Sequence, residues 1–156
     1  MRELKLIKQK YRDQIELSIA IGGWTQSVYF SNMTSTEKNM DNYINTFVSY
    51  FIQGNTPQED ANDKTREGWG ANVYTSISID WEFPGWKGNG NTYSPNDGFR
   101  LTRFLQKLRQ AAQKVVSANK LKIGVAISGD PAKMALDYFA HQVGNDANPQ
   151  FDMFRV

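Results

Sequence analysis

Residues 77 to 85, ISIDWEFPG, constrain the fold more than any other stretch, because apolar and polar residues alternate along them and a Pro-Gly pair follows. Side chains two positions apart lie on the same face of a β-strand. The two faces therefore carry different side chains: Ile77, Ile79, Trp81 and Phe83 on one, and Ser76, Ser78, Asp80 and Glu82 on the other. The apolar row predicts packing on a core, with Trp81 inside it, and the polar row predicts a face turned to water or to a ligand.

Strand and helix patterns alternate along the chain. Runs rich in β-branched residues predict strands at 15–23, 73–83 and 121–128, the first of them buried, and FDMFRV at 151–156 resembles the start of a fourth. Apolar residues at helical spacing predict helices at 35–53, from 94 onward and at 131–143. Such alternation is typical of a parallel sheet with right-handed crossovers. It predicts the α/β class, built either as an open doubly wound sheet or as a βα barrel.

Local signals mark the ends of the two longer helices. Thr34 and Glu37 have the spacing of a capping box, and Gly54 is a suitable stop for the helix that follows them. Ser94, Pro95 and Asp97 offer an N-cap, a first-turn proline and an acidic residue for the next helix. Each pattern predicts where a helix begins or ends.

Composition excludes several classes of site. The sequence has no cysteine and one histidine, which excludes a disulfide framework, a thiol nucleophile and a zinc-thiolate site within these residues. The formal net charge is only +2, with basic residues spread along the chain, so neither a nucleic-acid nor a membrane partner is expected. No apolar run reaches the roughly 18 residues of a membrane span.

The acidic pair Asp80 and Glu82 stands at the carboxyl end of the strand predicted at 73–83. In parallel βα folds this edge of the sheet is where active sites are built. Neighbouring carboxylates repel each other, which raises the pKa of one and makes it a proton donor. A D-x-E pattern alone is also typical of structural or solvated acids, so the spacing leaves both interpretations open.

Two motifs together resemble glycoside hydrolase family 18, the chitinases and related endo-N-acetylglucosaminidases. The family carries a D-x-x-D-x-D-x-E run on its fourth barrel strand, usually followed by Tyr-Pro-Gly, and an S-x-G-G run on its third. Here the first run aligns with residues 75–82, TSISIDWE, followed by Phe-Pro-Gly, and the second with residues 20–23, AIGG. The resemblance implies a partial (β/α)8 TIM barrel, covering about the third strand to the start of the sixth. Residues 1–156 would then be a fragment of one catalytic domain.

The resemblance also implies a mechanism and a set of site residues. The N-acetyl oxygen of the sugar attacks the anomeric carbon, Glu82 protonates the glycosidic oxygen, and Asp80 orients the acetamido group and stabilises the charged intermediate. No cofactor or metal is implied. The implied substrate contacts are Trp24, Trp86, Ser78, Gly22 and Gly23. The two tryptophans follow predicted strand ends, and each either stacks on a sugar ring or packs against the barrel rim.

Three positions depart from the family pattern. Thr75 and Ser78 stand where aspartates are usual, and Ala20 replaces the usual serine. The serine at 78 matters most, because a hydroxyl can donate a hydrogen bond to Asp80 but adds no charge. We expect a lowered activity or a shifted pH optimum from Ser78, and a structural role for Thr75. These departures also motivate an alternative function, a non-catalytic chitinase-like carbohydrate-binding protein or assembly subunit.

The length of the chain limits what it can do alone. A complete βα barrel takes about 250 residues and eight strands, so this chain of 156 residues is expected to belong to a larger polypeptide or complex and to be inactive in isolation. The implied partner is chitin or an N-acetylglucosamine oligosaccharide. The family implies an extracellular or secreted protein, although the first residues, MRELKLIKQKYRDQ, lack the apolar stretch of a signal peptide.

Overall fold

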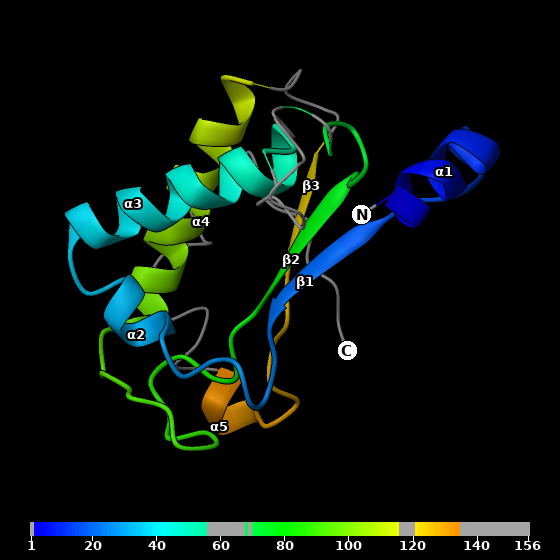
Figure 1. Ribbon diagram of the computed structural model, residues 1–156. Coiled ribbons are helices and arrows are strands. Elements are labelled where there is room, and N and C mark those ends of the chain that lie inside the picture. The colour runs from blue at the N-terminus through cyan, green and yellow to red at the C-terminus, as the bar shows by residue number, and fades with distance from the viewer. Residues whose placement is uncertain (1, 56–67, 69, 116–120, 135–156) are drawn as a thin grey trace, which may run out of the picture.

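The computed structural model describes residues 2–55, 68, 70–115 and 121–134. Three strands alternate with helices along this part of the chain (Figure 1). The strands are β1 (Ser18–Gly22), β2 (Ser76–Asp80) and β3 (Lys122–Val125), and the α-helices are α1 (Arg2–Tyr11), α2 (Phe30–Met33), α3 (Glu37–Phe47), α4 (Asp97–Gln113) and α5 (Pro131–Met134). A 3-10 turn at Arg12–Gln14 follows α1, and a π-helical turn at Val48–Ile52 extends α3. None of the described helices is long and apolar enough to span a membrane.

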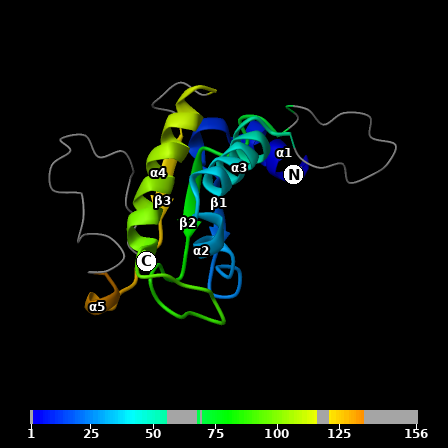
Figure 2. The same cartoon turned by 90° about the vertical axis from the view of Figure 1, so that its left-hand side faces the viewer.

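The three strands form one parallel sheet, as predicted, and their order in it is β1-β2-β3. Helices α3 and α4 both cover the same face of this sheet, whereas no described helix covers the opposite face (Figures 1 and 2). A doubly wound sheet has helices on both faces, and its strand order reverses at a switch point. Strands that advance in one direction under a single helical layer instead form part of a βα barrel, whose uncovered face is the barrel interior. The barrel alternative is therefore the correct one.

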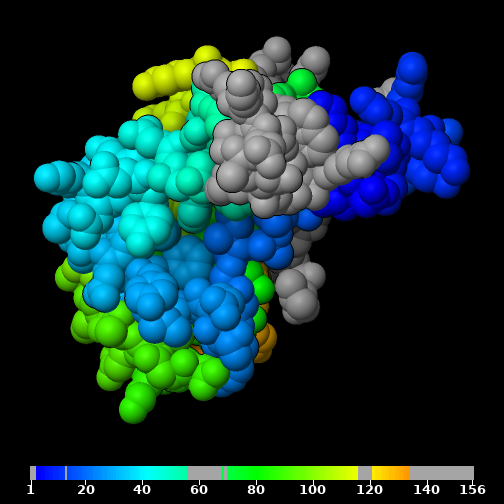
Figure 3. Space-filling view, in the orientation of Figure 1, coloured from blue at the N-terminus to red at the C-terminus, as the bar shows by residue number. Residues whose placement is uncertain are grey.

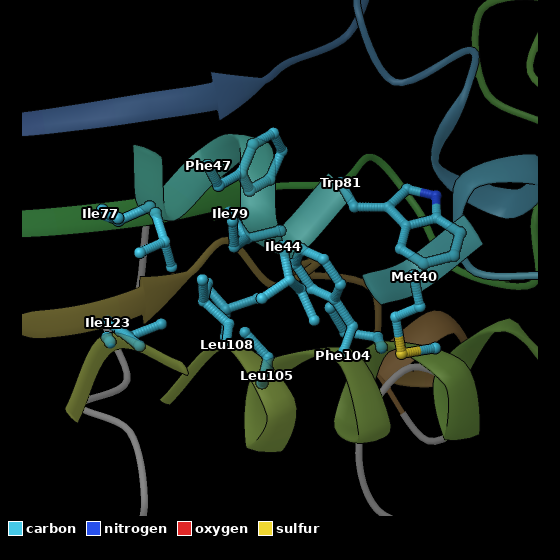
Figure 4. Packing of buried hydrophobic residues seen from close by; sticks show 14 of the residues in the cluster. Met40, Ile44, Phe47, Ile77, Ile79, Trp81, Phe104, Leu105, Leu108 and Ile123 are labelled. Atoms are coloured by element: carbon cyan, nitrogen blue, oxygen red, sulfur yellow. The ribbon is translucent and has the colours of Figure 1, made fainter. Parts of the chain in front are cut away.

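The hydrophobic core lies between the sheet and the two long helices (Figure 4). Ile77 and Ile79 are fully buried on β2, and Phe104 and Leu108 are fully buried on α4. Phe104 also meets Phe47 of α3 edge to face, with ring centroids 5.9 Å apart. Full burial of a side chain of this size stabilises the fold by about 1.5–3 kcal/mol. The apolar row of β2 thus holds the helices in place, as its alternation predicts.

Strand β1 differs from its sequence prediction. Its β-branched run predicts a buried strand, but Ser18 and Ala20 are exposed and the strand has no fully buried residue. Ser18 and Ala20 lie on the face that no described helix covers, whereas Ile19 and Ile21 on the other face are partly buried against the core.

Both helix starts lie two residues later than the capping patterns indicate. Helix α3 is capped by Thr36, whose hydroxyl accepts a hydrogen bond from the Asn39 N–H at 3.1 Å, while the Thr34 hydroxyl donates to the Phe30 carbonyl. Helix α4 begins at Asp97, and the Asp97 carboxylate accepts a hydrogen bond from the Ser94 N–H at 2.7 Å. Thr34 instead follows the end of helix α2 and is hydrogen-bonded to the backbone of that helix. The sequence pattern did not predict α2.

Other sequence predictions have mixed outcomes. Gly54 has a φ of +76° directly after the helical segment, so it is the stop that was expected. The predicted strands at 73–83 and 121–128 are present but shorter, as Ser76–Asp80 and Lys122–Val125. Residues 135–143 of the third predicted helix and residues 151–156 lie outside the described part.

Candidate active site

The polar face of β2 leads to the end of the strand, where Asp80 and Glu82 follow one another on the same side. Both side chains are half-buried, while Trp81 between them is 1% exposed and stacks on Phe30 with ring centroids 5.3 Å apart. Trp81 packs on the helical side, and the side chains of Asp80 and Glu82 are close enough to form a hydrogen bond with each other. The two carboxylates thus face the region that forms the interior of a closed barrel.

The glycine pair at the end of β1 lies directly against Asp80. Gly22 is the register partner of Asp80, and the Gly23 N–H donates to the Asp80 carbonyl at 2.7 Å. Gly22 has a φ of +117°, and a Cβ there would lie 2.2 Å from the Asp80 carbonyl oxygen and 2.8 Å from the Phe30 ring. Only glycine allows the strands to approach so closely. The expected roles of Gly22 and Gly23 therefore include an indirect one, the placement of Asp80.

The Glu82 side chain has a raised pKa. The largest cause is burial, which disfavours the charged carboxylate, and the second is the negative charge of Asp80. A side-chain hydrogen bond with Asp80 raises the pKa of Glu82 further. A carboxyl group that keeps its proton above the ordinary range is suited to donate that proton to a leaving group.

The backbone of Glu82 is held by two side chains from other segments. The Glu82 N–H donates to the Ser27 hydroxyl at 3.0 Å, and the Asn91 side-chain amide donates to the Glu82 carbonyl at 2.8 Å. Ser27 is fully buried and Asn91 is 5% exposed. Neither residue could be predicted from the sequence, because isolated polar residues in loops carry no periodic signal and these contacts span 55 and 9 positions.

Ser78 lies two register positions before Asp80 on the same face of β2, between small neighbours. Its register partners are Ala20 on β1 and Gly124 on β3, and all three lie in one row across the sheet. Two of the three positions that depart from the family pattern, Ala20 and Ser78, are therefore adjacent. Compared with the family pattern, the alanine and the serine place fewer polar atoms in this row, next to Asp80.

The remaining predicted residues lie apart from this row. Trp24, just past β1, is 54% exposed at the rim. Trp86 is half-buried, and the Lys133 ammonium lies 5.8 Å from the centre of its ring and 5.7 Å from that of Phe83, within the range of cation–π attraction. Thr75 exchanges hydrogen bonds with the Leu17 backbone at the opposite end of the strands, where it ties β1 to β2.

The loops after β1 and β2 meet at the rim. The Thr92 hydroxyl donates to the Val28 carbonyl at 3.3 Å, and the surfaces of the two loops lie side by side in the lower part of Figure 3. Among the residues that the structure describes, no three side chains of the metal-ligating types gather into a cluster. The titratable side chains at this end of β2 are those of Asp80 and Glu82, and the residues beside Asp80 at the end of β1 are the glycines Gly22 and Gly23.

Comparison with known proteins gives one family. The sequence model of Glycosyl hydrolases family 18 matches residues 1–156. Chitinase 1 of Yersinia entomophaga is 30% identical over 121 residues, which are 78% of this chain and 18% of that protein. A chitinase-like effector of Moniliophthora roreri is 27% identical over 127 residues, or 81% of this chain and 26% of the relative.

Solved structures agree with the sequence comparisons. The catalytic domain of psychrophilic chitinase B from Arthrobacter TAD20 superimposes with a TM-score of 0.77 at 28% identity, over 87% of this chain and 32% of that one. The present chain thus spans about a third of that domain and about a fifth to a quarter of the sequence relatives above. The fold is that of a portion of a chitinase barrel, as the single helical layer indicates.

Proposed function

The chain belongs to the glycosyl hydrolases of family 18, and we propose that the protein containing it cleaves β-1,4-linked N-acetylglucosamine polymers such as chitin. Residues 1–156 would form part of one catalytic barrel, which further strands complete. Both sequence relatives described above are named as chitinases or chitinase-like, which supports this substrate class. The observation that carries the proposal is the pair Asp80 and Glu82 on the uncovered face of the sheet, with the pKa of Glu82 raised.

In the proposed first step the substrate supplies its own nucleophile. The acetamido oxygen of the sugar attacks the anomeric carbon as the glycosidic bond breaks, and Glu82 gives its proton to the departing oxygen. The product of this step is a cyclic oxazolinium-like intermediate with a positive charge. In the second step a water molecule gives a proton to the Glu82 carboxylate and attacks the anomeric carbon, which reopens the ring with the configuration retained.

Asp80 is proposed to act on the acetamido group. Its carboxylate lies beside that of Glu82. The Asp80 backbone is fixed by the Gly23 N–H, which donates to the Asp80 carbonyl at 2.7 Å. A carboxylate at this place can accept the acetamido N–H and stabilise the positive intermediate. Trp24 and Trp86 are proposed to stack on sugar rings, and Trp24 is exposed enough to do so without rearrangement.

A second candidate function is carbohydrate binding without cleavage. The adjacent replacements at Ala20 and Ser78 favour it, because together they withdraw polar support from Asp80. The retained Glu82 favours hydrolysis, since a binding protein has no use for a proton donor. We therefore place hydrolysis first. Action outside the cell is part of the same proposal, as chitin is an extracellular polymer.

The test measures how the protein with its complete barrel cleaves two soluble oligosaccharides. Chitopentaose carries acetamido groups, whereas cellopentaose has the same linkage without them. We expect chitopentaose to be cut into shorter products and cellopentaose to remain intact, because only the former supplies the nucleophile. Equal cleavage of both would contradict the substrate-assisted mechanism. Saturable binding of chitopentaose without products would favour the carbohydrate-binding alternative.

A further inference from the structure

Glu82 lies two residues beyond the last residue of β2 that is paired with a neighbouring strand. The strand ends at Asp80, which is paired with Gly22 in the last register position between β1 and β2. The peptide groups of Glu82 therefore have no ladder partner, although buried backbone groups need one. Both are instead bound by side chains, the N–H by Ser27 and the carbonyl by Asn91.

Ser27 joins the end of β1 to the end of β2 through a single hydroxyl group. Its oxygen accepts the Glu82 N–H at 3.0 Å, and its hydrogen has two acceptors, the Gly23 carbonyl at 2.8 Å and the Asp80 carbonyl at 3.0 Å. The side chain is 0% exposed, so no water molecule can replace these contacts without a rearrangement. An alanine at this position leaves the Glu82 N–H without a partner.

Asn91 approaches Glu82 from the other side, out of the loop between β2 and α4. Its side-chain amide donates to the Glu82 carbonyl at 2.8 Å. The same loop passes so close that a Cβ at Gly88 would lie 2.5 Å from the Glu82 carbonyl oxygen and 2.6 Å from the Asn91 amide nitrogen. Glu82 is thus fixed between two loops that are themselves joined by the Thr92–Val28 hydrogen bond.

We propose that Ser27 and Asn91 act as a backbone clamp that sets the position of the Glu82 carboxyl group for proton transfer. Neither residue would contact the reacting atoms, so both are positioning residues. The inference rests on the proposed role of Glu82 as general acid. Displacement of a reacting group by about 1 Å can lower a rate by about 100-fold, so a clamp on the peptide of the acid acts directly on turnover.

Two matched controls separate a clamp from a contribution to stability alone. Ser31 is a second buried serine in the connection between β1 and α3, and its hydroxyl donates to the buried Asp97 carboxylate at 3.0 Å, away from Glu82. Asn89 lies in the same loop as Asn91 and is exposed. Substitution of the controls removes the same atoms without touching Glu82.

The experiment measures kcat and KM for chitopentaose cleavage by the protein with its complete barrel, together with the thermal midpoint of each variant. We expect Ser27→Ala and Asn91→Ala to lower kcat about 10- to 100-fold, with KM changed by less than about threefold. The controls Ser31→Ala and Asn89→Ala should keep kcat within about twofold of the wild type, even where Ser31→Ala lowers the thermal midpoint as much as Ser27→Ala.

Two results would overturn the clamp, and they are distinguishable. An active wild type whose clamp variants match their controls in kcat would contradict the clamp and leave the hydrolase proposal intact. A wild type that binds but does not cleave chitopentaose would overturn the hydrolase proposal, and with it the reason for a clamp. Should Ser27→Ala fail to fold, Asn91→Ala decides the matter, because it removes only the hydrogen bond to the Glu82 carbonyl and leaves the Ser27 contacts in place.

Discussion

The two faces of β2 differ in what they contribute, since one packs in the core and the other leads to the candidate site. On one face Ile77, Ile79 and Trp81 are at most 1% exposed and are packed under the helices. On the other, Ser78 and Asp80 are half-buried, and their register neighbours on β1 are an alanine and a glycine. Large side chains fill one face and small ones keep the other open. A strand of five residues can thus carry stability and chemistry separately, which predicts that substitutions on the two sides affect different measurements.

The largest expected effect on stability is on the helical side. Phe104→Ala removes a fully buried ring that meets Phe47, so it should lower the free energy of unfolding by about 3–5 kcal/mol. Phe99→Ala, on the same helix but 55% exposed, should change it by less than about 0.5 kcal/mol. Denaturation with urea measures both. Equal losses would mean that the burial described for α4 is wrong.

A smaller effect is expected where the two faces meet at the strand end. Gly22→Ala places a methyl group 2.2 Å from the Asp80 carbonyl oxygen at a φ of +117°, whereas Gly90→Ala has a φ of +78° and nothing within 4 Å. We expect Gly22→Ala to lower the free energy of unfolding by about 1–3 kcal/mol more than Gly90→Ala. It should also lower kcat, because Asp80 must move. A Gly22→Ala protein as stable and active as Gly90→Ala would contradict the close approach of β1 and β2.

The smallest expected effects are changes in pH dependence on the polar face. A general acid must be protonated, so kcat/KM falls as the pH rises through the pKa of Glu82. Asp80→Asn removes a negative charge that raises this pKa, so the alkaline limb of the residual activity should move to lower pH. Ser78→Asp adds a negative charge beside Asp80 and should move the limb to higher pH. The nearby cation Lys133, which lies over the rings of Phe83 and Trp86, is present in the wild type and in both variants, so it does not contribute to the difference between them.

Profiles of kcat/KM against pH check this pair of shifts, with wild type and both variants measured in the same buffers. Opposite shifts would place both positions in the electrostatic environment of Glu82. Identical limbs in all three proteins would mean that another group governs the alkaline limb, and would separate Glu82 from the observed activity.

The sequence predicted those features of the fold that depend on local periodicity. The alternation identified the two faces of β2 and the burial of Ile77, Ile79 and Trp81, and helical spacing identified α3 and α4. At the two ends of the run the prediction was less accurate, because Phe83 is half-buried outside the core and Ser76 is buried. The choice between a barrel and an open sheet needed the structure, because it depends on which face of the sheet the helices cover. The burial of β1 was mispredicted for a related reason, since its neighbours and not its composition determine its exposure.

For the candidate site, the sequence identified the carboxylates but not the residues around them. Asp80 and Glu82 could be found because their motif is contiguous in the chain. Ser27 could not, because it meets Glu82 across 55 positions and only the folded loop brings them together. The adjacency of Ala20 and Ser78 was equally hidden, as it follows from the register between two strands.

The most direct test of the central claim, that the polar face of β2 ends in a general acid, is the turnover of chitopentaose by Glu82→Gln in the protein with its complete barrel. Glu37→Gln, the same change at an exposed glutamate of α3, is the control. We predict that Glu82→Gln lowers kcat by about 10²- to 10⁴-fold while the affinity for chitopentaose changes by only a few fold, and that Glu37→Gln turns over normally. Turnover by Glu82→Gln at the rate of the control would contradict the account.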